Sequence, residues 1–191
     1  MKVIAFNGSA RKEGNTAYLL KTVLDEIEKE GIATEIYHLA GKSIQGCIAC
    51  YKCFTNKNMR CAVENDIINE CISKMLGAQG ILLGSPTYFA NVSTNMKALI
   101  ERTGMVARAN GDMFKRKAGA GVVAVRRAGS AHVFSSLNYF FLIGQMIIPG
   151  SSYWNIAIGR EPGEVMNDNE GIQTMKTLGQ NMAWLLNKIY K

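Results

Sequence analysis

The chain has 191 residues, of which 48% are hydrophobic and 19% are charged, and its formal net charge is +7. This length suffices for one domain with a full core, and the composition is ordinary for a globular protein. No apolar run approaches the roughly 18 residues that a membrane span needs, and the opening run stops at Gly8, too soon for a signal peptide. We therefore expect a cytoplasmic protein. Because the basic residues are scattered, neither a membrane nor a nucleic acid is expected as a partner.

Strand-like runs alternate with helical patterns along the whole chain. We expect strands at 2–7, 34–38, 80–84 and 118–125, and a fifth that begins near Met146 and runs into 151–154. Apolar residues at helical spacing predict helices over about 20–27, 67–75, 96–103, 130–143 and 175–189. The alternation predicts a single α/β domain, residues 1–191, with a parallel sheet covered on both faces and its longest loops at 41–65 and 104–117. Ligands bind such sheets at the carboxyl ends of the strands.

The loop after the first expected strand is suited to a phosphate. Unpaired N–H groups and the helix dipole both favour an anion where a loop opens a helix. The loop lacks the Gly-Lys pair of a P-loop, and Ala10 stands where the dinucleotide fingerprint needs its second glycine. A polar turn in which Asn15 or Thr16 merely caps the helix is an alternative from this loop alone. The candidate phosphate ligands are Ser9, Arg11, Gly14, Asn15 and Thr16.

The order Gly8-Ser9-x-Arg11, then Gly14-Asn15-Thr16, resembles the phosphate loop of the NADPH-dependent FMN reductases, a branch of the flavodoxin-like proteins. The resemblance covers nearly the whole chain. It implies a flavodoxin-like α/β fold, a five-stranded parallel sheet of order 2-1-3-4-5 with helices on both faces, and FMN as cofactor.

The loops after the third and fourth expected strands extend the resemblance. The stretch Ser85-Pro86-x-Tyr88 matches the family, with Glu101-Arg102 where the family has Asp-Arg, and implies that 85–92 wrap the isoalloxazine ring. Aromatic lids and a turn-forming proline are the structural alternative. After the fourth strand, Arg126 and Arg127 stand where small residues are common in the family. The alternatives for these arginines are that they face the flavin, that they face a phosphate of NADPH, or that they are solvated. The ring candidates are Ser85, Pro86, Thr87, Tyr88, Phe89, Asn91, Val92, Arg126, Arg127 and Gly129.

Four of the five cysteines lie in one loop, as Cys47, Cys50, Cys53 and Cys61. Four thiolates suit a tetrahedral zinc site or an iron–sulfur cluster, and a structural disulfide is not expected in a reducing compartment. The compact spacing resembles that of the iron–sulfur flavoproteins of the same superfamily, which implies a [4Fe–4S] cluster on these four residues and matches Asp66 to an acidic position after the fourth cysteine. Zinc and free redox-active thiols are the alternatives. The fifth cysteine, Cys71, is expected in the core.

We therefore expect an FMN-dependent oxidoreductase that passes electrons between FMN and a cluster. NAD(P)H or a ferredoxin-like protein is the expected electron partner. One alternative is an NAD(P)H-dependent FMN or quinone-type reductase without a cluster; another is a pure electron carrier; a third is a redox-sensing module based on thiols or zinc. No catalytic side chain is expected, because the flavin carries the chemistry. The resemblance implies a homodimer or homotetramer.

Overall fold

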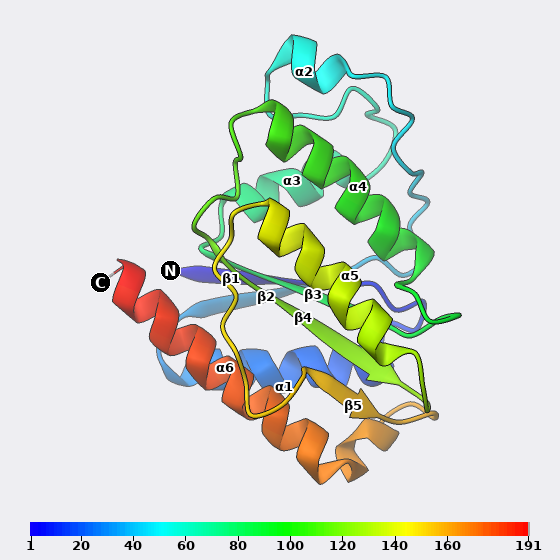
Figure 1. Cartoon of the computed structure of the whole chain (residues 1–191), viewed down its shortest axis with the longest axis vertical. Helices are drawn as coiled ribbons and strands as arrows, with labels where there is room; N and C mark the ends of the chain where they lie inside the picture. The colour runs from blue at the N-terminus through cyan, green and yellow to red at the C-terminus, as the bar shows by residue number, and fades with distance from the viewer. Residues whose placement is uncertain (191) are drawn as a thin grey trace.

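The computed structural model describes residues 1–190. Five strands form one parallel sheet in the order β2-β1-β3-β4-β5, which confirms the predicted flavodoxin-like topology. Figure 1 shows α1 and α6 on one face of the sheet and α3, α4 and α5 on the other. The elements are β1 (Lys2–Asn7), α1 (Asn15–Lys29), β2 (Ala33–His38), α2 (Lys52–Asn56), α3 (Ile68–Leu76), β3 (Gly80–Pro86), α4 (Thr94–Ala109), β4 (Ala118–Val125), α5 (Ser130–Ile143), β5 (Ile156–Ile158), a 3₁₀ turn η1 (Glu164–Asn167) and α6 (Asn169–Tyr190).

Each face of the sheet has its own hydrophobic core. Successive side chains of a strand point to opposite faces, so Val3 and Ala5 of β1 pack with α1 and α6, whereas Ile4 and Phe6 pack with α3, α4 and α5. Strand β4 is buried along its whole length. Burial on both faces explains why the strands are apolar runs rather than alternating patterns.

The carboxyl ends of the strands lie close together at one edge of the sheet. The N–H of Gly8, just after β1, donates to the carbonyl of Gly84 in β3 at 2.8 Å. A Cβ atom at Gly84 would lie 2.7 Å from Leu20 Cδ1 and 2.9 Å from Thr16 Cγ2, so only glycine lets α1 approach β3 this closely. The first turn of α1 is thereby fixed against the end of β3.

The fifth strand was predicted in the wrong place. The predicted run contributes only an isolated bridge between Ile147 and Ala118, and the strand itself is Ile156–Ile158, which pairs with Val123–Val125. After the bridge at Ile147 the chain leaves β4, and it pairs with that strand again only over the three residues of β5. A strand that short has too few residues to show a pattern of its own.

Three further boundaries differ from the predictions. The short helix α2 lies inside the cysteine loop, and the turn η1 lies between β5 and α6; neither was predicted. Helix α4 continues to Ala109, so the loop expected at 104–117 is shorter. None of the helices within residues 1–190 is long and apolar enough to cross a membrane.

Candidate functional site

The loop after β1 is shaped by the side chain of Asn7. Its Oδ1 accepts the N–H of Ser9 at 3.0 Å, and its Nδ2 donates to the carbonyl of Lys12 at 3.3 Å. The hydroxyl oxygen of Ser9 in turn accepts the N–H of Arg11 at 3.1 Å. These bonds hold residues 8–14 in a turn.

At the start of α1, the N–H groups of Asn15 and Thr16 have no acceptor among residues 1–190, whereas Ala17 and Tyr18 donate to the carbonyl of Gly14. The N-cap residue is Gly14, and no side chain among residues 1–190 caps the helix, so the alternative of a simple capping role for Asn15 or Thr16 is wrong. Asn15 instead accepts the N–H of Gly163 at 2.8 Å. The hydroxyl of Thr16, a residue only 1% exposed, has no hydrogen-bond partner among residues 1–190. A helix start with free donors is an anion-binding feature.

A cavity of ≈ 280 Å³ opens between the loops at the carboxyl edge; we call it the edge cavity. Three arginines border it, and a second buried hydroxyl, that of Thr87, also lacks a partner in the described chain. Unpaired buried hydroxyls are costly, so their presence in a positively charged cavity indicates an anionic, hydrogen-bonding ligand. The edge cavity is lined by Ser9, Arg11, Gly14, Asn15, Thr16, Pro86, Thr87, Tyr88, Ala124, Arg126, Gly159 and Arg160.

The turn after β3 projects from this edge in a strained conformation. Tyr88 and Asn91 exchange two backbone hydrogen bonds, of 3.0 and 2.9 Å, and the two residues between them have positive φ, 48° at Phe89 and 56° at Ala90. Such conformations cost about 1–3 kcal/mol for non-glycine residues and persist chiefly at functional sites. Phe89 is fully exposed. A strained turn with an exposed aromatic tip suits contact with a planar ring.

Some predicted ring residues face away from the edge cavity. Ser85 is fully buried and its hydroxyl oxygen accepts the N–H of Ser93 at 3.0 Å, while Val92 packs in the core. Both support the turn from behind. The amide oxygen of Asn91 accepts the N–H of Val92 at 2.8 Å, which fixes the far end of the turn.

The loop after β4 packs against that turn. Gly129 has φ 87°, and a Cβ atom there would lie 2.9 Å from Ala90 Cβ, so glycine is needed for this contact. Arg126 lines the edge cavity, whereas Arg127 is exposed beside it. Gly159 and Arg160, which form a further wall, were not predicted. They directly follow β5, and a correct position for that strand would have indicated them.

His38 connects β2 to the phosphate loop. Its Nδ1 lies 3.1 Å from Asn7 Nδ2, an arrangement in which the neutral ring accepts a hydrogen bond from the amide. Burial and the nearby Lys12 lower the pKa of His38. The neutral imidazole of His38 therefore stabilises Asn7 in the position in which its side chain holds the turn of residues 8–14.

The four cysteines of the second loop line one small cavity of ≈ 20 Å³, which we call the cysteine cavity. Cys47 and Cys50 are exposed, Cys61 is half-buried and Cys53 is buried. Two residues between them, Ala49 and Tyr51, have φ of 50° and 56°. Left-handed residues of this kind are part of the anion-binding nests that are found at many iron–sulfur sites.

The cysteine sulfurs are not spaced for one metal ion. A zinc ion holds each of its sulfur ligands at about 2.3 Å, and within residues 1–190 no three His, Cys, Asp or Glu side chains are arranged for a single ion. A [4Fe–4S] cluster spreads its four cysteines over four iron atoms and needs wider spacing. Four cysteine side chains are suitable donors for an iron–sulfur cluster and for zinc alike.

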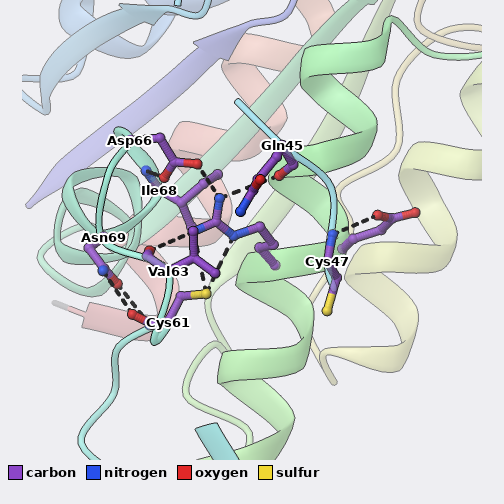
Figure 2. A network of polar contacts seen from close by, with 9 residues as sticks. Gln45, Cys47, Cys61, Val63, Asp66, Ile68 and Asn69 are labelled. Carbon is purple, nitrogen blue, oxygen red and sulfur yellow. Dashed lines mark hydrogen bonds and ion pairs between the residues drawn. The ribbon is translucent and has the colours of Figure 1, made fainter. Parts of the chain in front are cut away.

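Arg102 of α4 joins the two ends of the cysteine loop, because its Nη1 donates to the carbonyl of Gln45 and to Asp66. Figure 2 shows Gln45, Val63, Asp66 and Cys61 gathered in this polar network. It forms an ion pair with Asp66, and both side chains are almost fully buried. Its Nε and Nη2 donate to the sulfur of Cys61, each at 3.4 Å. Burial alone would lower the pKa of Arg102, but its bonds to Asp66 and Cys61 raise it, so the guanidinium is charged.

Cys71 differs from the other four cysteines. It is fully buried in the core, as predicted, and burial together with Glu70 raises the pKa of its thiol to about 12. A neutral buried thiol of this kind is inert.

Comparison with known proteins agrees with this geometry. Residues 1–161 match the family of NADPH-dependent FMN reductases. The chain belongs to that family. It is an FMN-dependent oxidoreductase of the NADPH-dependent FMN reductase family, and its fold is as the family resemblance implied.

Relatives within the family carry a more specific name. A Methanocaldococcus jannaschii protein named iron-sulfur flavoprotein is 36% identical over 198 aligned positions, which cover 100% of both chains. An iron-sulfur flavoprotein of Methanosarcina thermophila is 28% identical and covers 100% of this chain and 98% of its own.

Solved structures share the fold at low identity. RosB with bound 8-demethyl-8-formylriboflavin-5'-phosphate has a TM-score of 0.77 at 16% identity and covers 100% of this chain and 82% of its own. An NAD(P)H:quinone oxidoreductase of Methanothermobacter marburgensis has a TM-score of 0.70 at 11% identity, covering 95% and 96%.

Proposed function

We propose that this single domain binds FMN in the edge cavity and a [4Fe–4S] cluster on Cys47, Cys50, Cys53 and Cys61, and that it passes electrons between them. The observation that carries the flavin site is the pair of buried hydroxyls, on Thr16 and Thr87, that have no hydrogen-bond partner among residues 1–190 and lie in a cavity with three arginines. The names of the iron-sulfur flavoprotein relatives support the cluster.

Each loop has its own part in holding the flavin. The free N–H groups of α1 and the hydroxyls of Ser9 and Thr16 bind the phosphate, and Arg11 adds positive charge. The turn with Phe89 at its tip covers the ring, supported from behind by Gly129. When bound, FMN exchanges electrons in pairs or singly, and a [4Fe–4S] cluster exchanges them singly. The chain can therefore link a two-electron donor such as NAD(P)H to a one-electron partner such as a ferredoxin-like protein.

The two sites are separated within one chain. Figure 1 shows α2 and its loop beyond α4, away from the carboxyl edge of the sheet. A groove of ≈ 880 Å³ runs along α4 and α5 beside Cys47, and Tyr139, Leu142 and Ile143 border it as exposed apolar side chains. Large exposed apolar patches mark contact surfaces. A homodimer or homotetramer would bring the cysteine loop of one chain near the flavin of another.

Anaerobic purification tests the proposal directly. We expect about one FMN and about four iron atoms per chain, with a visible spectrum that shows both flavin and cluster bands. Replacing exposed Cys50 with serine should lower the iron content and leave the FMN content unchanged, whereas Cys71→Ala should leave both unchanged. Flavin without iron in wild-type protein would favour the reductase without a cluster, and protein that binds no flavin would refute the proposal.

Bleaching by NADPH distinguishes the electron donors. Rapid anaerobic bleaching by NADPH alone would identify the nicotinamide as donor, and bleaching only by a reduced ferredoxin would identify a protein donor.

A further inference from the structure

The side chain of Arg102 is almost completely buried, which is rare for an arginine. Its exposed fraction is 1%, and it is the largest of the fully buried side chains in the described chain. An unpaired buried charge costs several kcal/mol. The hydrogen-bond partners of this guanidinium must therefore compensate for its burial.

Every N–H of the guanidinium has an acceptor. An arginine has five such donors. Nη1 donates to Asp66 and to the carbonyl of Gln45 at 3.3 Å, and Nη2 donates to the carbonyl of Val63 at 2.8 Å. The remaining two donors, on Nε and Nη2, both point at the sulfur of Cys61 (Figure 2). A thiol sulfur is a weak acceptor, so two donors on one sulfur fit a sulfur that carries negative charge.

Cys61 is set apart from the other three cysteines of the cavity. Among residues 1–190, no side chain donates a hydrogen bond to the sulfur of Cys47, Cys50 or Cys53, and Cys53 itself donates to the carbonyl of Met105. The backbone of Cys61 is held separately by Asn69, which accepts its N–H at 2.8 Å and donates to its carbonyl at 3.0 Å. The position of Cys61 therefore does not depend on Arg102 alone.

We propose that Arg102 is a positioning residue that sets the reduction potential of the cluster through its two N–H···S bonds to Cys61. The inference rests on the proposed function, since it needs the cluster. Hydrogen bonds and positive charge at a ligating sulfur stabilise the reduced, more negative state and raise the potential. The carboxylate of Asp66 partly neutralises the guanidinium and opposes this effect.

The experiment compares three variants of the purified, iron-replete protein. Arg102→Gln removes the charge and the donors to Cys61, and Asp66→Asn removes the neutralising carboxylate. Arg108→Gln is the matched control, because Arg108 lies on the same helix, is exposed and forms an ion pair with Asp112. The measured quantity is the cluster reduction potential, from an optically monitored redox titration, with iron per chain measured on each sample.

The two test variants should shift the potential in opposite directions. For Arg102→Gln we expect the ratio of reduced to oxidised cluster at a fixed potential to fall on the order of tenfold, which is about 59 mV for a one-electron couple. Asp66→Asn should raise that ratio, and Arg108→Gln should leave it unchanged. A merely structural role would instead change iron retention without opposite shifts in potential.

Each outcome decides between the alternatives. If Arg102→Gln loses its iron, the reduction potential is measured on Arg102→Lys instead. Lysine keeps the charge but cannot place two donors on one sulfur, so the potential should fall by less than the amount expected for Arg102→Gln. An unchanged potential in the iron-replete variant, or shifts of the same sign in both, overturns the inference alone. Wild-type protein that binds no iron overturns the proposed cluster, and the inference with it.

Discussion

The hydroxyl of Thr16 gives the sharpest test of the flavin site. This hydroxyl is buried at the start of α1, beside the edge cavity, and has no hydrogen-bond partner in the part of the chain that the structure describes. Thr16→Val removes the oxygen and nearly keeps the shape. The substitution should therefore stabilise the FMN-free protein and weaken its binding of FMN, two effects of opposite sign.

The structure sets the size of both effects. Removing an unsatisfied buried polar group should stabilise the FMN-free chain by about 1–3 kcal/mol. For a protein of this length, each kcal/mol raises Tm by about 2–4 °C. A hydrogen bond to a charged group contributes about 1.5–3 kcal/mol, so the Kd for FMN should rise by roughly 10- to 150-fold.

Two assays and a control complete the test. Calorimetry of the FMN-free protein gives Tm, and quenching of flavin fluorescence gives Kd. Thr103→Val is the control, because Thr103 is equally buried but its hydroxyl donates to the carbonyl of Leu99 at 2.7 Å. It should lower stability slightly and leave Kd unchanged. If Thr16→Val leaves both Tm and Kd at the wild-type values, the edge cavity is not where FMN binds.

Three further predictions concern other parts of the site. The fold lowers the pKa of His38, so the neutral ring contributes to stability above pH 6.5, the ordinary pKa of histidine, and this contribution is lost as the pH falls through the folded pKa. The FMN affinity and the Tm of the wild-type protein should therefore fall in that pH range, whereas those of His38→Gln should change little with pH. Ala90→Gly should raise the Tm of the FMN-free protein, since φ is 56° there and relief of such strain gives about 1 kcal/mol or more; an unchanged or lower Tm would show that the turn is not strained. Cys50→Ser should lose iron while Cys71→Ala keeps it, and equal loss in both would contradict the assignment of ligands.

Much of the sheet could be predicted because its signals are local. Strand β4 and helix α5 were predicted with the bounds that the structure shows, since each is a continuous apolar or periodic run. Strand β5 was missed because three residues carry no pattern, and pairing with β4 alone defines it. The phosphate loop was recognised from residues adjacent in the sequence, and the structure places them around one cavity.

Contacts between segments that are distant in the sequence could not be predicted from such local patterns. The bond between Asn15 and Gly163 spans 148 positions, and it brings the loop of Arg160 to the edge cavity. The bonds between Arg102 and Cys61 span 41 positions. The sequence showed Arg102 only as part of a family motif and showed nothing of its partners, because a buried network is fixed by how α4 packs on the cysteine loop.

Amide hydrogen exchange with and without FMN tests the central claim most directly. If the loops at the carboxyl edge hold the flavin, FMN should slow exchange in segments 8–17, 85–93, 126–130 and 159–164, and leave the groove along α4 and α5 unchanged in the same oligomer. Protection that appears elsewhere, with none in these four segments, would contradict the account.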